Sequence, residues 1–167
     1  MVDSAVILAQ MRAALAVEKT IVGPLRWNAG TRPRTFALAA LAEHPIQNLE
    51  LHLTAAAALP NEHVGFQLCL SVPGHTFPVT RFDWRPPRPH VNKFGKLKGI
   101  ASETGLHPFE ANAELGLTMM VANNLPVCVP VTPEPPDFPS AVAYVCDTFR
   151  LRLRDPIPLP PWSPTLI

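Results

Sequence analysis

Polar side chains that could carry out acid and base chemistry gather in one stretch of the chain, between residues 81 and 112. They are Arg81, Asp83, His90, Asn92, His107, Glu110 and Asn112. Most of them belong to two similar motifs, His90-Val91-Asn92 and the run from His107 to Asn112. Histidine changes its charge near neutral pH, and arginine can stabilise a negative charge that develops in a reaction. This stretch is therefore the candidate site.

A metal centre is the first chemistry to consider. His107 and Glu110 are three residues apart and could share one face of a helix. With His90 as a third ligand, such a centre would keep one coordination position open. The spacing matches no diagnostic metal-binding pattern, however, and Pro108 could instead begin a turn in which both histidines bond the backbone. We predict no metal and no cofactor.

Cleavage of a phosphodiester is the second chemistry. In a small nuclease or toxin-like phosphodiesterase, the two histidines and Glu110 would transfer protons. Arg81 and Lys93 would stabilise charge on the phosphate, and Asp83 would orient the base. Alternatively, Arg81 and Asp83 form a surface ion pair worth less than about 1 kcal/mol. We keep the nuclease as an alternative hypothesis.

Binding without catalysis is the third possibility. Basic and aromatic residues that could contact a partner alternate after residue 83: Trp84, Arg85, Arg88, Lys93, Phe94 and Lys96. Such a stretch could stack bases and contact phosphates. The whole chain has a net charge of only +1 and a pI near 7.8, so no overall bias toward nucleic acid exists. A protein partner is therefore the stronger expectation and nucleic acid the weaker one.

The elements that must position this stretch follow from hydrophobic periodicity. Apolar residues at helical spacing after Asp3 predict an amphipathic N-terminal helix that continues until Gly23-Pro24. Strict alternation in 49–54 and 66–71 predicts strands, with a further partner in 77–84. A helix capped by Asp137 follows near the end. We predict an α+β fold: an N-terminal helix, an antiparallel β-meander of about four strands within 34–84, a long polar loop at 85–112 and a C-terminal helix.

Composition bounds the rest of the organisation. The chain has 167 residues with 47% hydrophobic content, which suits a single domain over 1–167 with a proline-rich extended tail at 155–167. Runs 115–121 and 125–131 could be strands or buried extended chain. The three cysteines show no paired spacing, and no signal peptide or membrane helix is predicted. We therefore expect a bacterial-type cytoplasmic protein that does not contact membranes.

After the first helix, several short motifs occur in a recognisable order: Phe66-x-Leu68-x-Leu70-x-x-Pro73, then Phe77-Pro78, then Pro86-Pro87, then His90-x-Asn92 with Gly95 just after it. Over residues 1 to 100 this order resembles the core of ubiquitin-conjugating enzymes. The resemblance implies that His90 is a structural histidine and that Asn92 stabilises the oxyanion during transfer from a thioester.

The sequence also departs from that family. Val91 replaces the proline of the corner, and the Pro-Pro pair comes later than in the family. Residues 93–105 contain no cysteine, although the reaction requires a thiolate there. The resemblance therefore implies an inactive variant. We expect a non-catalytic binding or accessory protein that makes protein-protein contacts through the 85–112 loop.

Overall fold

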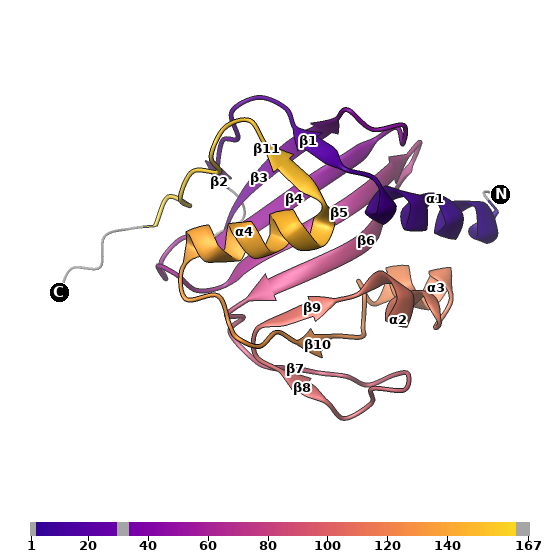
Figure 1. Ribbon diagram of the computed structural model, residues 1–167. Coiled ribbons are helices and arrows are strands. Elements are labelled where there is room, and N and C mark those ends of the chain that lie inside the picture. Colours follow the sequence, from indigo (N-terminus) through magenta and orange to yellow (C-terminus); the bar gives the residue numbers. More distant parts are fainter. Residues whose placement is uncertain (1–2, 30–33, 163–167) are drawn as a thin grey trace.

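The computed structural model describes residues 3–29 and 34–162 and combines helices with one large sheet (Figure 1). The N-terminal helix α1 spans Ser4–Ala16, and its N-cap Asp3 accepts a hydrogen bond from the Ala5 amide at 2.9 Å. Its apolar face buries Ile7 and Met11. The helix is shorter than predicted, because the chain turns into a strand well before Gly23.

The predicted meander is present. It consists of β3 (Arg34–Ala42), β4 (Leu49–Ala56), β5 (Val64–Val72) and β6 (His75–Trp84), each antiparallel to the next. Burial alternates along these strands as the sequence indicates: Leu51, Leu53, Phe66 and Leu68 are fully buried. The period of two in a strand places such residues on one face of the sheet.

The prediction of about four strands is too low. In the part of the chain that the structure describes, the main sheet has nine strands in the order β10-β9-β6-β5-β4-β3-β1-β11, with β2 paired to β3. The additional strands are β1 (Lys19–Ile21), β2 (Asn28–Ala29), β9 (Gly105–His107), β10 (Val129–Pro130) and β11 (Leu151–Leu153). They are two or three residues long, too short for a periodic pattern to identify them.

The stretch 85–112 is not the single long polar loop of the prediction. It contains a small hairpin, β7 (His90–Val91) and β8 (Ala101–Ser102), which projects below the main sheet in Figure 1. It also contains β9 and the start of helix α2 (Phe109–Ala113). The following run, predicted as strand or extended chain, is helix α3 (Leu117–Ala122). This helix has only six residues and no strong helical period of apolar residues, so the sequence pattern did not identify it.

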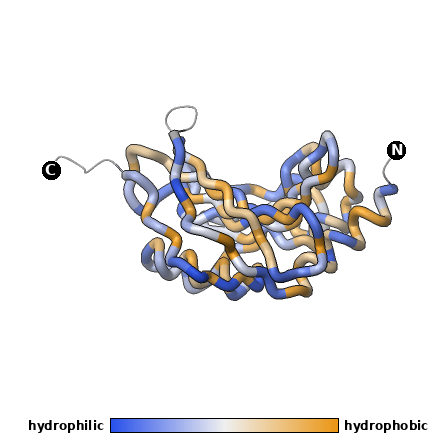
Figure 2. The backbone as a smooth tube through the Cα atoms, turned by 90° about the horizontal axis from the view of Figure 1, so that it is seen from above, coloured by the Kyte–Doolittle hydropathy of each residue, from blue (hydrophilic) through white to orange (hydrophobic). Residues whose placement is uncertain are grey.

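The C-terminal helix α4 (Phe138–Phe149) begins where predicted, because Asp137 accepts a hydrogen bond from the Ser140 amide at 2.8 Å. It covers one face of the meander. Its Phe138 stacks on Phe66 with ring centroids 6.1 Å apart, and Tyr144 lies 4.7 Å from Phe82. Seen from above, the sheet is bent so that the side away from α4 is concave (Figure 2).

Two further features complete the core. Lys19 is fully buried, and its Nζ donates to the carbonyls of Ala14 and Val17, both at 2.6 Å, at the C-terminal end of α1. The described part of the proline-rich tail, 155–162, lies on its own domain, since the Trp27 indole N–H donates to the Pro158 carbonyl at 2.9 Å. No helix in the described residues has the length and apolar character to span a membrane.

Candidate functional site

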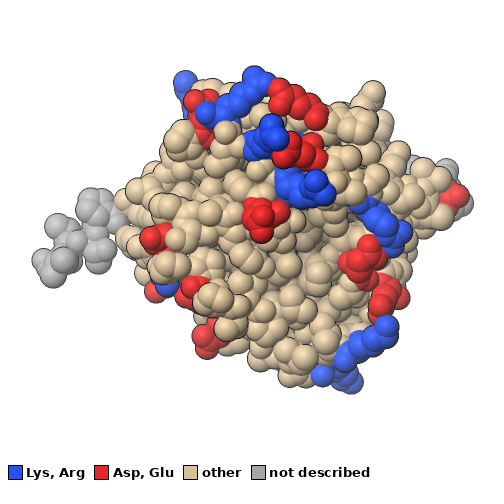
Figure 3. All heavy atoms as spheres, viewed as in Figure 1, with Lys and Arg blue, Asp and Glu red and all other residues tan. Residues whose placement is uncertain are grey.

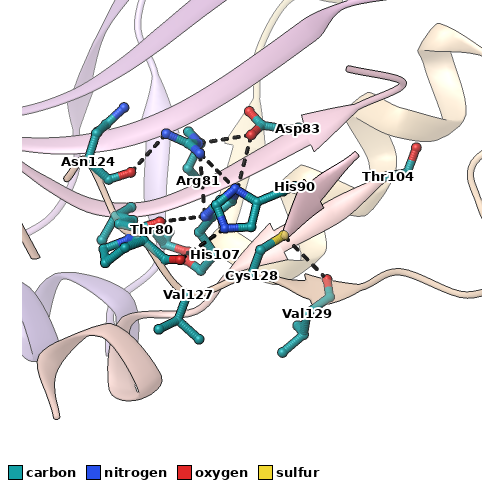
Figure 4. Close-up of polar contacts among 12 residues, drawn as sticks. Thr80, Arg81, Asp83, His90, Thr104, His107, Asn124, Val127, Cys128 and Val129 are labelled. Atoms are coloured by element: carbon teal, nitrogen blue, oxygen red, sulfur yellow. Dashed lines mark hydrogen bonds and ion pairs between the residues drawn. The ribbon is translucent and has the colours of Figure 1, made fainter. Parts of the chain in front are cut away.

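The centre of the candidate site is a polar network of Arg81, Asp83 and His107 (Figure 4). It lies on the side of the sheet away from α4, because Phe82, between Arg81 and Asp83 on β6, packs against Tyr144 of α4. Register places Arg81 of β6 opposite His107 of β9, and Asp83 opposite Gly105. Arg81 Nη2 lies 2.9 Å from His107 Nε2, and Arg81 Nε lies 3.0 Å from Asp83 Oδ2. The ion pair that we considered from the sequence is therefore present, but it is partly buried and includes His107.

The protonation of His107 follows from its surroundings. Its ring is fully buried, and burial lowers the pKa of His107 below its usual value despite the carboxylate of Asp83. Its Nδ1 lies 2.6 Å from the Leu125 carbonyl oxygen, and its Nε2 lies 2.9 Å from Arg81 Nη2 and 3.1 Å from Asp83 Oδ2. Burial works to raise the pKa of Asp83, but its contacts with His107 and Arg81 hold that pKa below the ordinary value. The network thus contains one ionised carboxylate, one guanidinium and a neutral imidazole.

The two sequence motifs meet on one backbone segment, residues 125–128. His90 Nε2 donates to the Pro126 carbonyl at 2.9 Å, as His107 does to the Leu125 carbonyl. The two rings are in edge contact, with centroids 4.9 Å apart. Both histidines of the candidate site are thus committed to backbone carbonyls.

The two asparagines of the motifs bind the same segment. The Asn92 side chain accepts from the Cys128 amide at 2.7 Å and donates to its carbonyl at 2.8 Å. Asn112 makes the same pair of bonds to Val127, both at 2.8 Å. Each asparagine replaces the neighbouring strand that a buried peptide group would otherwise need. We call His90, Asn92, His107 and Asn112 the His-Asn clamp.

The clamp holds a backbone conformation that is unfavourable by itself. Asn124 and Leu125 have φ angles of 46° and 62°, in the left-handed region. This region is costly for a residue with a branched apolar side chain such as leucine. The neighbouring contacts are strong: the Leu125 carbonyl bonds His107, and the Asn124 carbonyl accepts from Arg81 Nη1 at 2.8 Å. The polar network and the clamp therefore act together to fix the turn that leads into 125–128.

The clamp also fixes Cys128, which is 36 residues from Asn92 along the chain. In space it lies directly beside Asn92, yet it is only 1% exposed. A Cβ atom on Gly105 would lie 2.3 Å from its Sγ, so the glycine makes room for the thiol. Burial raises the pKa of the Cys128 thiol to about 11. The thiol is protonated and shielded at neutral pH.

The structure does not bring Glu110 into this cluster. Its carboxylate makes a two-pronged ion pair with Arg12 of α1, both bonds at 2.8 Å, and it is exposed. Within the described ranges, no group of three or more His, Cys, Asp or Glu side chains is placed to hold a metal ion. The i, i+3 spacing of His107 and Glu110 therefore has a different consequence: one side chain is in the core and the other on the surface.

The residues considered for binding are also divided. Trp84 is fully buried and donates its indole N–H to the Pro135 carbonyl at 2.9 Å. Arg85 lies over the Trp84 ring and pairs with Glu134 at 2.7 Å. The other four residues considered for binding lie in the hairpin or just before it. Arg88, Lys93 and Lys96 are exposed, and Phe94 is half-buried. The exposed part of the predicted binding stretch is thus the hairpin and the segment before it.

Sequence reasoning recognised the two His-Asn motifs but not their common target. Residues 125–128 and the Asn124 carbonyl contribute through backbone atoms, which carry no signal in the side-chain pattern. The only available hint was the presence of two similar motifs. Comparison with protein-family models, curated protein sequences and solved structures finds no match for this chain.

Proposed function

We propose that this protein is a non-catalytic binding or accessory protein that acts through protein-protein contacts of residues 85–112. The observation that supports this most directly is the His-Asn clamp. Its side chains, which in an enzyme would act on a substrate, hydrogen-bond the buried backbone of 125–128 instead. A general base must reach the proton that it removes. The fully buried His107 cannot do so in this conformation, which favours binding over the nuclease alternative.

The state of the cysteines supports the same proposal for a chain that resembles ubiquitin-conjugating enzymes. The chain has three cysteines, and burial raises the pKa of Cys69, Cys128 and Cys146 to about 11. A thiolate is the nucleophile in thioester chemistry, so a thiol with such a pKa reacts slowly at neutral pH. The position of Cys128 beside Asn92 makes it the thiol to test.

The surface that we propose for contacts is the β7–β8 hairpin. Lys93 and Lys98 are exposed in the segment that joins its two strands, and Val91 and Ile100 are 52% and 40% exposed. The clamp anchors this hairpin to 125–128, because His90 and Asn92 donate to the carbonyls of Pro126 and Cys128. Asn92 also donates to the Leu97 carbonyl within the hairpin, at 3.2 Å. The face that carries the helices shows a different pattern: acidic and basic side chains lie interspersed near its upper rim (Figure 3). That face has no single-sign patch of the kind that nucleic acid requires.

Two experiments test the proposal. The protein is incubated with a ubiquitin-like protein, its activating enzyme and ATP, and its intact mass is measured without reductant. We expect no adduct, and a thioester on any cysteine would overturn the non-catalytic proposal.

The second experiment measures binding. Tagged wild-type protein and the double variant Lys93→Glu/Lys98→Glu are used to capture partners for quantitative mass spectrometry. Proteins that bind through the hairpin are lost with this variant and retained with Arg26→Glu/Arg152→Glu, which reverses two exposed charges elsewhere. Equal recovery with both variants would refute the role of the hairpin.

A further inference from the structure

The side of the sheet away from α4 has a gap in its side-chain covering at Gly65 of β5. Strand register places Thr54 of β4 on one side of Gly65 and Asp83 of β6 on the other. The neighbouring row on the same face consists of His52, Gln67 and Arg81. A glycine in a central strand weakens the sheet and often marks a position where a ligand comes close. The position of Gly65 is therefore a reason to look for a site.

A hollow of about 380 Å³ lies over Gly65. Two arginines, two histidines and one aspartate contribute its charged and titratable lining: Arg34, Arg81, His52, His63 and Asp83. Thr54 and Gln67 add polar groups, and Pro86 and Pro87 form a rigid wall. This size lies in the range of small-molecule sites, which combine a concave shape with a few convergent polar groups.

The charges of the lining favour a negatively charged ligand. Asp83 is the only carboxylate among the described residues of the lining, and it is already paired with Arg81 at 3.0 Å. The histidines have carboxylates beside them: His52 Nε2 lies 2.9 Å from Glu50 Oε2, and His63 Nε2 lies 3.9 Å from Glu62 Oε2. Neither glutamate lines the hollow. The positive charge that remains for a ligand comes from the guanidinium of Arg34 at the rim.

Neutral donors lie next to this charge. Among the described residues, the Gln67 amide makes its one side-chain hydrogen bond to Cys69 Sγ, at 3.4 Å, which is a weak use of an amide donor. Gln67 lies directly opposite His52 in the strand register, and Thr54 lies opposite Gly65. A guanidinium with an amide and a hydroxyl nearby is suited to the several oxygen atoms of an oxyanion. The geometry points to the hollow over Gly65 as a binding site for a small molecule that carries a phosphate or carboxylate group.

This site is independent of the proposed hairpin contacts, and it can be tested directly. The full-length protein, labelled with ¹⁵N, is titrated at constant ionic strength with inorganic phosphate, with pyrophosphate and with citrate, against a sodium chloride control. We expect saturable chemical-shift changes at the amides of His52, Thr54, Gly65 and Gln67. The phosphate and citrate arms distinguish the two oxyanion classes.

Variants decide whether the hollow itself is responsible. Arg34→Gln should weaken binding by about tenfold, the loss of one charge-assisted hydrogen bond. Gly65→Ala should weaken it as well, because its Cβ would lie 2.9 Å from Thr54 Oγ1 and 3.5 Å from Asp83 Oδ1, inside the hollow. Arg26→Gln removes the same charge from an exposed arginine that does not line the hollow and should leave binding unchanged.

The outcomes separate clearly. Thermal unfolding and the unliganded spectra show whether each variant is folded, and the exposed Arg34→Gln variant provides the test if Gly65→Ala does not fold. The absence of saturable shifts with all three anions overturns the proposal. Shifts centred outside the hollow also overturn it, as does an equal loss of affinity in Arg34→Gln and Arg26→Gln.

Discussion

Replacement of Asn92 by alanine tests the His-Asn clamp most directly. The substitution removes the side-chain partners of the Cys128 amide and carbonyl, which bond Asn92 at 2.7 and 2.8 Å. Asn92 is 2% exposed and Cys128 1%, so water cannot easily replace those bonds. A buried polar group left without a partner costs about 1–3 kcal/mol, so two of them predict a loss of about 2–6 kcal/mol.

Chemical denaturation followed by tryptophan fluorescence measures this loss as a change in the free energy of unfolding. A domain of this size is stable by about 5–15 kcal/mol, so Asn92→Ala should unfold at a much lower denaturant concentration. Asn123→Ala is the matched control. Asn123 is exposed and donates only to the Met119 carbonyl in its own helix, so we expect a change within about 0.5 kcal/mol.

Asn92→Asp adds a test of the direction of the bonds. The introduced carboxylate can still accept from the Cys128 amide, but when ionised it repels the carbonyls of Cys128 and Leu97, to which the amide donated. Burial and this repulsion raise the pKa of the introduced group in the folded state. The free energy of unfolding of Asn92→Asp, relative to wild type, should therefore be highest near pH 4 and should fall as the pH rises through the raised pKa. A loss below about 1 kcal/mol for Asn92→Ala, or no pH dependence for Asn92→Asp, would refute the clamp.

Three further predictions follow from buried groups. Burial, aided by the charge of Arg150, lowers the pKa of Lys19 from 10.5 to about 8. The unfolded chain therefore keeps this proton to higher pH than the folded chain. As the pH rises from 8 to 10.5, the free energy of unfolding of the wild type should increase by up to about 3 kcal/mol relative to that of Lys19→Met. Denaturant titrations at each pH measure this difference. Gly105→Ala places a Cβ 2.3 Å from Cys128 Sγ and should cost about 1–3 kcal/mol, and a double-mutant cycle with Cys128→Ala should recover much of that loss. Thiol titration should show slow modification of Cys69 and Cys128 in the native protein and complete modification in denaturant; fast native reaction would contradict their burial.

Local sequence patterns were sufficient to predict the long strands and the C-terminal helix of this fold. Alternating leucines in 49–54 and the Asp137 cap report on one strand and one helix at a time, so the four long strands of the meander and the start of α4 could be predicted. The short strands β9 and β10 could not. β9 is held by pairing with the edge of β6, and β10 is held by pairing with β9; both are too short to show a periodicity of their own.

The candidate site divides in the same way. The sequence alone determined that two His-Asn motifs exist, that Asp83 follows Arg81 at strand spacing, and that residues 93–105 contain no cysteine. Only the tertiary structure decided what the motifs bind, because their partners are backbone groups of 125–128. Any residue type could provide the carbonyls, and any except proline could provide the amides. It also separated His107 from Glu110, since the chain enters α2 between them and one side chain turns inward while the other turns to the surface. Side-chain chemistry can be read along a chain, whereas the burial that determines its use depends on which distant segments pack around it.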